Sequence, residues 1–274
     1  MTGQEKLWAG GRTILYAIRP LVLYLVVPGI CMGIGMILRR YPGGARQFTE
    51  ESGNFYTLVS LGVVAALLHR AAKKRGSSVP EEATLYVRDQ NRRLAVLCLG
   101  LGICLGLLLS AGLTLVPLPG WLKGSYGSSS SAMFRQRDLV VAVANVTVLA
   151  PVVEEILFRG YMLNRLLTFF DEKAAVYISA FVFALCHVNP VWMVYSFGMG
   201  VFLARISLER DNIYYSCLVH MGFNLPSALL ACIQASGIGK GMLFDSPVLI
   251  LLYGLIGAAA GRLVWTEMGK ERNL

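Results

Sequence analysis

The sequence predicts an all-α protein, a polytopic membrane helical bundle of about eight transmembrane helices. Three observations lead to this prediction. Hydrophobic residues make up 55% of the 274 residues, and the mean hydropathy is +0.59. Charged residues make up only 15%, against roughly 25% in a soluble domain. Several apolar runs are also long enough to cross a bilayer core of about 30 Å. We therefore expect one integral membrane domain over residues 1–274, in contact with the lipid bilayer.

The apolar runs give the predicted spans in chain order. They lie at about 14–38, 55–69, 94–116, 139–170, 174–190, 191–208, 213–236 and 246–265. The fifth and sixth runs are short and only Asn189 and Pro190 mark a break between them, so one of the two could be re-entrant. Polar segments separate most of the other runs. The Ser/Gly stretch GSYGSSSS at 124–131 is expected to be a flexible loop.

The distribution of Lys and Arg predicts the orientation of these spans. With the N-terminus inside, the inner segments hold 17 basic residues and the outer loops hold 7. Basic residues favour the cytoplasmic side, so we expect both termini in the cytoplasm, at the plasma membrane in a bacterium. The net charge of +9 comes from residues at the edges of apolar runs, with no basic face and interleaved aromatics. We therefore expect no nucleic acid partner, and the sequence indicates no oligomeric state.

The fourth run carries three ionisable residues in apolar surroundings: Glu154, Glu155 and Arg159. Charged groups inside a span are costly and mark functional sites by default. Glu155 and Arg159 are four residues apart with the acid first, the favourable order for an ion pair on a helix. Glu154 points about 100° away and has no partner on its own helix, so it is the candidate general base. Alternatively, both acids neutralise basic residues on other helices and serve packing alone.

Two of the three histidines lie inside apolar runs. His187 ends FVFALCH, and His220 precedes Asn224 by one helical turn in CLVHMGFNL, whereas His69 lies at the basic end of the second run. One buried histidine is usually a satisfied core residue. Two of them beside a buried acid pair favour a shared polar site, because polar groups at membrane depth must find each other or water. An imidazole and an amide one turn apart could donate to a developing oxyanion.

Together these three patterns resemble the motifs of a known family. EEILFR at 154–159, FALCH at 183–187 and HMGFN at 220–224 resemble the EExxxR, FxxxH and HxxxN motifs of the CAAX proteases and bacteriocin-processing proteins. This is the Abi (CPBP) family of intramembrane glutamic endopeptidases. The motifs occur in the family's order on three separate predicted spans. The resemblance covers residues 139–230, which we expect to be the family-like catalytic core.

The resemblance implies a role for each matching residue. Glu154 would activate a water molecule, and His187 would help to hold that water. His220 and Asn224 would form the oxyanion hole, and the supporting motif residues would be Glu155 and Arg159. Such a site requires the first four residues to line one polar pocket between the fourth, fifth and seventh spans. We expect that pocket to open toward the cytoplasm or laterally to lipid, with Glu154 within about 10 Å of the imidazoles.

The predicted function is a metal-independent endopeptidase, without a cofactor, that acts on a peptide or a membrane-protein substrate. Zinc is an alternative, since two histidines and carboxylates can bind it, but HExxH is absent and Asn224 is a poor ligand. The six cysteines include no CxxC pair and are expected to be small hydrophobic residues. A second alternative is a non-catalytic membrane regulator or a bacteriocin immunity protein on the same scaffold. A transporter lacks the support of paired half-chain repeats.

Overall fold

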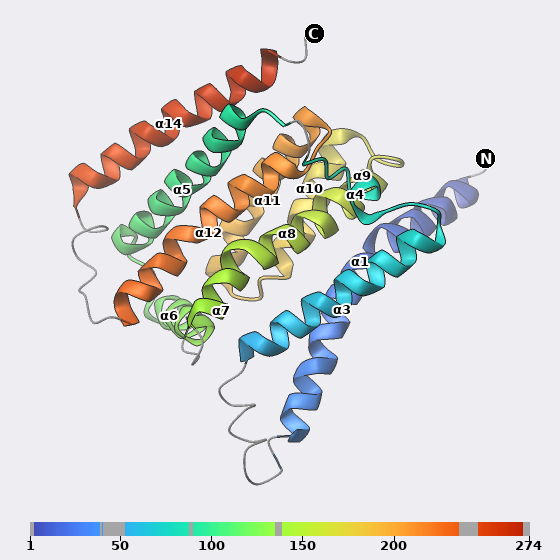
Figure 1. Cartoon of the computed structure of the whole chain (residues 1–274), viewed down its shortest axis with the longest axis horizontal. Coiled ribbons are helices and arrows are strands. Elements are labelled where there is room, and N and C mark those ends of the chain that lie inside the picture. Colours follow the sequence, from blue (N-terminus) through green and yellow to red (C-terminus); the bar gives the residue numbers. More distant parts are fainter. Residues whose placement is uncertain are drawn as a thin grey trace.

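The computed structural model describes residues 3–38, 40, 53–87, 90–134, 139–235 and 246–270, and every regular element in these ranges is a helix. This agrees with the all-α prediction. The long helices lie alongside one another in a bundle (Figure 1). The main helices are α1 (Gly3–Leu38), α3 (Gly53–Lys74), α5 (Arg92–Leu115), α10 (Glu172–Leu185), α11 (Pro190–Arg210), α12 (Tyr214–Ala235) and α14 (Pro247–Lys270), with a segmented fourth span at Leu139–Leu166.

Five helices among the described residues are long and apolar enough to cross a membrane. They are Arg92–Leu115, Leu139–Leu166, Pro190–Arg210, Tyr214–Ile233 and Pro247–Gly269. Each of the eight predicted runs falls on a helix, but those in α1, α3 and α10 do not meet this criterion. The 14 residues of α10 rise only about 21 Å at 1.5 Å per residue, less than a bilayer core of about 30 Å. The expected eight transmembrane helices are therefore not confirmed.

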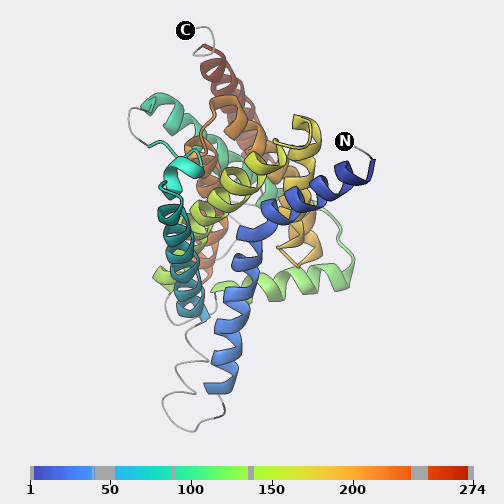
Figure 2. The same cartoon turned by 90° about the vertical axis from the view of Figure 1, so that its right-hand side faces the viewer.

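A helix, α6 (Gly120–Phe134), occupies the stretch that was expected to be a flexible loop. It lies across one end of the bundle, crosswise to its long helices (Figure 2). The hydroxyls of Ser125 and Ser129 accept hydrogen bonds from Nδ2 of Asn189, at 3.1 and 3.2 Å. The loop prediction was wrong because composition alone does not show that serine hydroxyls can bond to another element instead of water.

The helix ends divide between the two ends of the bundle. One end of the bundle holds the first residues of α1 and α5 and the last residues of α3 and α14. The other end of the bundle holds α6 (Figures 1 and 2). The first and last described helices therefore place their outer ends on one side, as the predicted orientation requires. Which side faces the cytoplasm stays a prediction.

Glycines allow α5 and α12 to pack closely. A Cβ atom at Gly102 would lie 2.1 Å from the carbonyl oxygen of Val219, and one at Gly222 would lie 2.3 Å from that of Leu99. A larger residue at either position would push the two backbones apart. This contact fixes the position of α12, the helix that carries His220 and Asn224.

Candidate active site

The fourth span alternates between α-helical and π-helical segments. Its segments are α7 (Leu139–Ala144), a π-helix (Asn145–Leu149), α8 (Ala150–Glu155), a second π-helix (Ile156–Leu163) and α9 (Asn164–Leu166). Glu154 and Glu155 end α8 and therefore lie between the two π-helices. Short π-helical segments within α-helices occur frequently at functional sites. Pro151 explains the first one, because a proline inside a helix lacks an N–H and disturbs the preceding turn.

The side chain of Asn224 compensates for this proline. The N–H of Ala150 bonds to the carbonyl of Asn145, five residues back. In the same register the carbonyl of Val146 would need the N–H of Pro151, which does not exist. Instead, Nδ2 of Asn224 donates to the Val146 carbonyl at 3.0 Å. The bond fixes the orientation of the Asn224 amide, whose nitrogen carries a second hydrogen.

Glu155 and Arg159 form the predicted ion pair. NH1 of Arg159 lies 2.7 Å from Oε1 of Glu155, and both side chains are 0% exposed. NH2 of Arg159 also donates to the Gly200 carbonyl at 3.2 Å. The guanidinium carbon lies 4.4 Å from the centre of the Phe183 ring, a distance that permits a cation–π interaction. The charge of Arg159 is therefore compensated on several sides.

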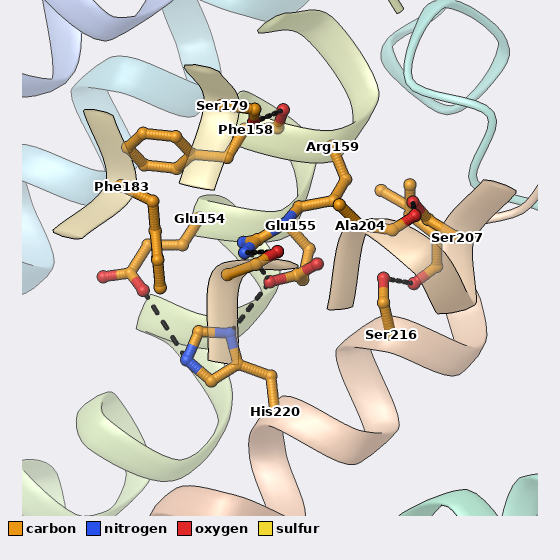
Figure 3. A network of polar contacts seen from close by, with 12 residues as sticks. Glu154, Glu155, Phe158, Arg159, Ser179, Phe183, Ala204, Ser207, Ser216 and His220 are labelled. Atoms are coloured by element: carbon orange, nitrogen blue, oxygen red, sulfur yellow. Dashed lines mark hydrogen bonds and ion pairs between the residues drawn. The ribbon is translucent and has the colours of Figure 1, made fainter. Parts of the chain in front are cut away.

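His220 lies between the two glutamates. Its Nδ1 is 2.9 Å from Oε1 of Glu155, and its Nε2 is 3.7 Å from Oε2 of Glu154 (Figure 3). The sequence did not predict this contact with Glu155. Because Nδ1 is engaged there, Nε2 is the ring nitrogen directed toward Glu154.

Glu154 has a different environment from that of its neighbour in the chain. Its side chain is 14% exposed, against 0% for Glu155. The hydroxyl of Tyr24 in α1 donates to Oε1 of Glu154 at 2.8 Å. Glu154 therefore faces an open space, whereas Glu155 is sealed within the helices.

That space is a cavity of about 1070 Å³. Its lining includes the four residues for which one shared pocket was predicted: Glu154, His187, His220 and Asn224. They come from the fourth span, the end of α10 and α12, as predicted. The separation of 3.7 Å between Glu154 and His220 is well inside the expected limit. The catalytic roles of these residues stay a prediction.

His187 lies in a strained turn just after α10. Its Nδ1 is 2.9 Å from the carbonyl oxygen of Phe183. If Nδ1 donates to this carbonyl, Nε2 is the nitrogen that can accept a hydrogen bond in the cavity. The next residue, Val188, has φ of 56°. For a β-branched residue this backbone costs about 1–3 kcal/mol, and such strain clusters at functional sites. Asn189 then caps α11 through the N–H of Val191.

The cavity extends toward the end of the bundle that carries α6. Its wall includes Lys123 and Tyr126 of α6 and Leu118 just beyond the end of α5. The predicted orientation places this end outside the cytoplasm. Where the cavity opens, toward the cytoplasm or laterally to lipid, stays a prediction.

The residues of the cavity wall that sequence reasoning missed include Tyr24 and Lys123. Tyr24 is one of 12 tyrosines and belongs to no motif, so no spacing distinguishes it. Lys123 lay in the segment expected to be a loop. Among the described residues, no group of three or more His, Cys, Asp or Glu side chains is arranged to hold a metal ion.

The arrangement as a whole places carboxylates, imidazoles and an amide around one cavity within apolar helices. Residues 136–226 match the family model of the Rce1-like type II CAAX prenyl endopeptidases. The match begins just before α7, ends within α12, and includes all three motifs. It confirms the resemblance to the CAAX protease family over this part of the chain. No curated protein and no solved structure matches the chain.

Proposed function

We propose that the protein is an intramembrane endopeptidase in which Glu154 activates the attacking water. The observation that carries this proposal is the single cavity lined by Glu154, His187, His220 and Asn224. Its volume of about 1070 Å³ lies at the upper end of the range of about 300–1,000 Å³ for small-molecule pockets. A segment of a peptide or of a membrane protein fits a space of this size.

The proposed reaction is hydrolysis of one peptide bond. Glu154 removes a proton from water while the water oxygen attacks the carbonyl carbon, and the carbonyl oxygen becomes an oxyanion. The proton then passes from Glu154 to the amide nitrogen, and the C–N bond breaks. One peptide leaves with a new carboxyl group and the other with a new amino group. No oxidant, reductant or further reactant is needed.

Two donors are available for the oxyanion. The second hydrogen on Nδ2 of Asn224 is one, because the first is held by the Val146 carbonyl. Nε2 of His220 is the other when it carries a hydrogen, because Nδ1 is engaged by Glu155. Donors that are already fixed in place stabilise a developing oxyanion without the cost of reorganisation.

His187 holds the water in this proposal. With Nδ1 donating to the Phe183 carbonyl, Nε2 accepts a hydrogen bond from the water that Glu154 deprotonates. The edge of its ring packs against Phe183, with centroids 4.7 Å apart. Phe183 and Phe158 line the same cavity and limit the entry of bulk water.

The direct experiment compares the wild type with Glu154→Gln, purified in detergent, on a quenched-fluorescence peptide library. Loss of a general base should reduce turnover by about 10²–10⁴-fold. Glu82→Gln, which alters an acid outside the cavity, is the matched control and should cleave like the wild type. If the wild type cleaves no peptide, or Glu154→Gln cleaves as fast, the endopeptidase proposal is wrong. A non-catalytic membrane regulator would cleave no peptide.

We also propose that both termini face the cytoplasm, which places α6 on the opposite side. The support is the excess of basic residues, 17 against 7, in the segments that would lie inside. A reporter fused after Leu274 should be active only in the cytoplasm, and one inserted at Ser128 in α6 only outside it. Activity of the Leu274 fusion outside would reverse the orientation and place the α6 end of the cavity in the cytoplasm.

A further inference from the structure

Tyr24 reaches the candidate site from a helix outside the region that matches the family. Its hydroxyl donates to Oε1 of Glu154 at 2.8 Å, and its side chain lines the cavity. The edge of its ring packs against Phe158, with centroids 6.5 Å apart. α1 ends at residue 38, whereas the family match begins at residue 136. The three motifs therefore do not include this contact.

The hydroxyl distinguishes the two oxygens of Glu154. Oε1 accepts the hydrogen bond from Tyr24, whereas Oε2 lies 3.7 Å from Nε2 of His220. A carboxylate on a flexible side chain can rotate, and a fixed donor on one oxygen restricts that rotation. Resting on the proposed function, we infer that Tyr24 is a positioning residue: its hydroxyl holds Oε1 so that Oε2 faces His220 and the cavity.

α1 is held firmly enough for this task. It packs against the second π-helix, which directly follows Glu155. Leu21, one helical turn before Tyr24, is buried in the same hydrophobic cluster as Leu157 and Phe158. The helix that supplies the donor and the helix that supplies the carboxylate therefore form one packed unit, and the hydrogen bond spans 130 residues of sequence.

A misplaced reacting group can cost about 10²-fold in rate even when the shift is only 1 Å. The variant Tyr24→Phe removes the hydroxyl and keeps the ring. With a quenched peptide that the wild type cleaves, we expect kcat to fall by about 10–100-fold, while KM changes by less than about twofold. A purely structural role would instead lower the fraction of folded protein and leave kcat per folded molecule unchanged.

The matched control is Tyr177→Phe. Tyr177 lies on α10, is 45% exposed, stacks on Phe197, and does not line the cavity. Like Tyr24→Phe, the Tyr177→Phe variant removes one tyrosine hydroxyl from the bundle, but it should leave kcat and KM unchanged.

A second measurement does not depend on turnover. Dicyclohexylcarbodiimide labels carboxyl groups in apolar surroundings, and a carboxyl group that a fixed donor holds in place is less free to react. Mass spectrometry should therefore find more label on Glu154 in Tyr24→Phe than in the wild type or Tyr177→Phe. Equal labelling of Glu154 in the three proteins overturns the inference, whatever the peptide assay shows.

The two assays separate the two proposals. If Glu154→Gln is inactive while Tyr24→Phe matches Tyr177→Phe in kcat, this inference is wrong and the proposed function stands. If the wild type cleaves no peptide, the proposed function is wrong, and the labelling still decides whether Tyr24 controls Glu154.

Discussion

The fourth span has two faces that differ in almost every physical respect, although their acids are adjacent in the chain. Glu155 is fully buried and engaged by Arg159 and His220, whereas Glu154 faces a cavity of about 1070 Å³. Burying a charge is costly unless it is paired and hydrogen-bonded. The sealed face pairs its carboxylate with Arg159 and His220, and the cavity face leaves a carboxylate beside open space. Position on the helix, and not residue type, therefore gives the two acids their different surroundings.

The largest expected effect on stability comes from breaking the sealed face. Glu155→Gln leaves the buried Arg159 without its carboxylate, which should lower the free energy of unfolding by about 3–5 kcal/mol. Thermal unfolding in detergent and the yield of monodisperse protein measure this loss. Glu154→Gln is the matched control and should unfold like the wild type. A stable, catalytically inactive Glu155→Gln together with an active Glu154→Gln would exchange the roles of the two faces.

A smaller effect is expected from replacing Pro151, whose missing N–H leaves the Val146 carbonyl to Asn224. Pro151→Ala supplies the N–H that the Val146 carbonyl lacks, so Asn224 loses its fixed partner. Removing one oxyanion donor costs about 10²–10³-fold in rate, and loosening one should cost about 10-fold in kcat. Thermal stability should not fall, because alanine favours a helix interior more than proline does. Pro80→Ala, on the exposed α4 (Val79–Glu82), should leave kcat unchanged.

The stability contributed by the exposed ion pair of Arg75 and Glu82 can be compared with that of the buried pair of Glu155 and Arg159. NH2 of Arg75 lies 2.6 Å from Oε2 of Glu82, with side chains 44% and 17% exposed. The hydrogen bonds from Arg75 lower the pKa of the Glu82 carboxyl. A lowered folded-state pKa contributes stability above the unfolded pKa of about 4.3, and this is lost as pH falls through the folded value.

The Arg75→Ala variant should therefore lose less than about 1 kcal/mol at neutral pH. Its difference from the wild type should disappear in acid below the folded-state pKa of Glu82. Thermal unfolding of both proteins as a function of pH measures this difference. A loss as large as that of Glu155→Gln would mean that burial does not set the cost of breaking these pairs.

The smallest expected effect is that of chelation. Prolonged incubation with EDTA or phenanthroline should leave turnover unchanged, because the proposed mechanism uses only side chains and water. Loss of activity that zinc restores would instead indicate a metal site with His187 and His220 as ligands.

The sequence predicted the parts of the site that depend on local spacing. The four-residue separation of Glu155 and Arg159 places them on one helical face, and the ion pair is present. Asn224 lies on α12 and His187 in the turn after α10, and their shared cavity was predicted from their places in apolar runs and from the family resemblance. The sequence did not reveal the contact between Tyr24 and Glu154, because packing between distant helices decides it.

Other parts of the fold were beyond local reasoning for a different reason. The π-helical register of the fourth span depends on how the chain redistributes hydrogen bonds around Pro151, and Asn224 contributes from another helix. α6 was mistaken for a loop because its serines bond to Asn189 instead of water. The predicted span at α10 is not confirmed, because its apolar residues form a helix of only 14 residues.

The close contact between α5 and α12 also bears on how the protein is made. A chain is synthesised from its N-terminus and can begin to fold before it is complete, so α5 enters the membrane long before α12 exists. The groove at Gly102 and Gly106 is then without its occupant, because the backbone that fills it belongs to residues 219–226. His220 and Asn224 arrive with that backbone. The cavity therefore acquires His220 and Asn224 only after most of the chain has been inserted.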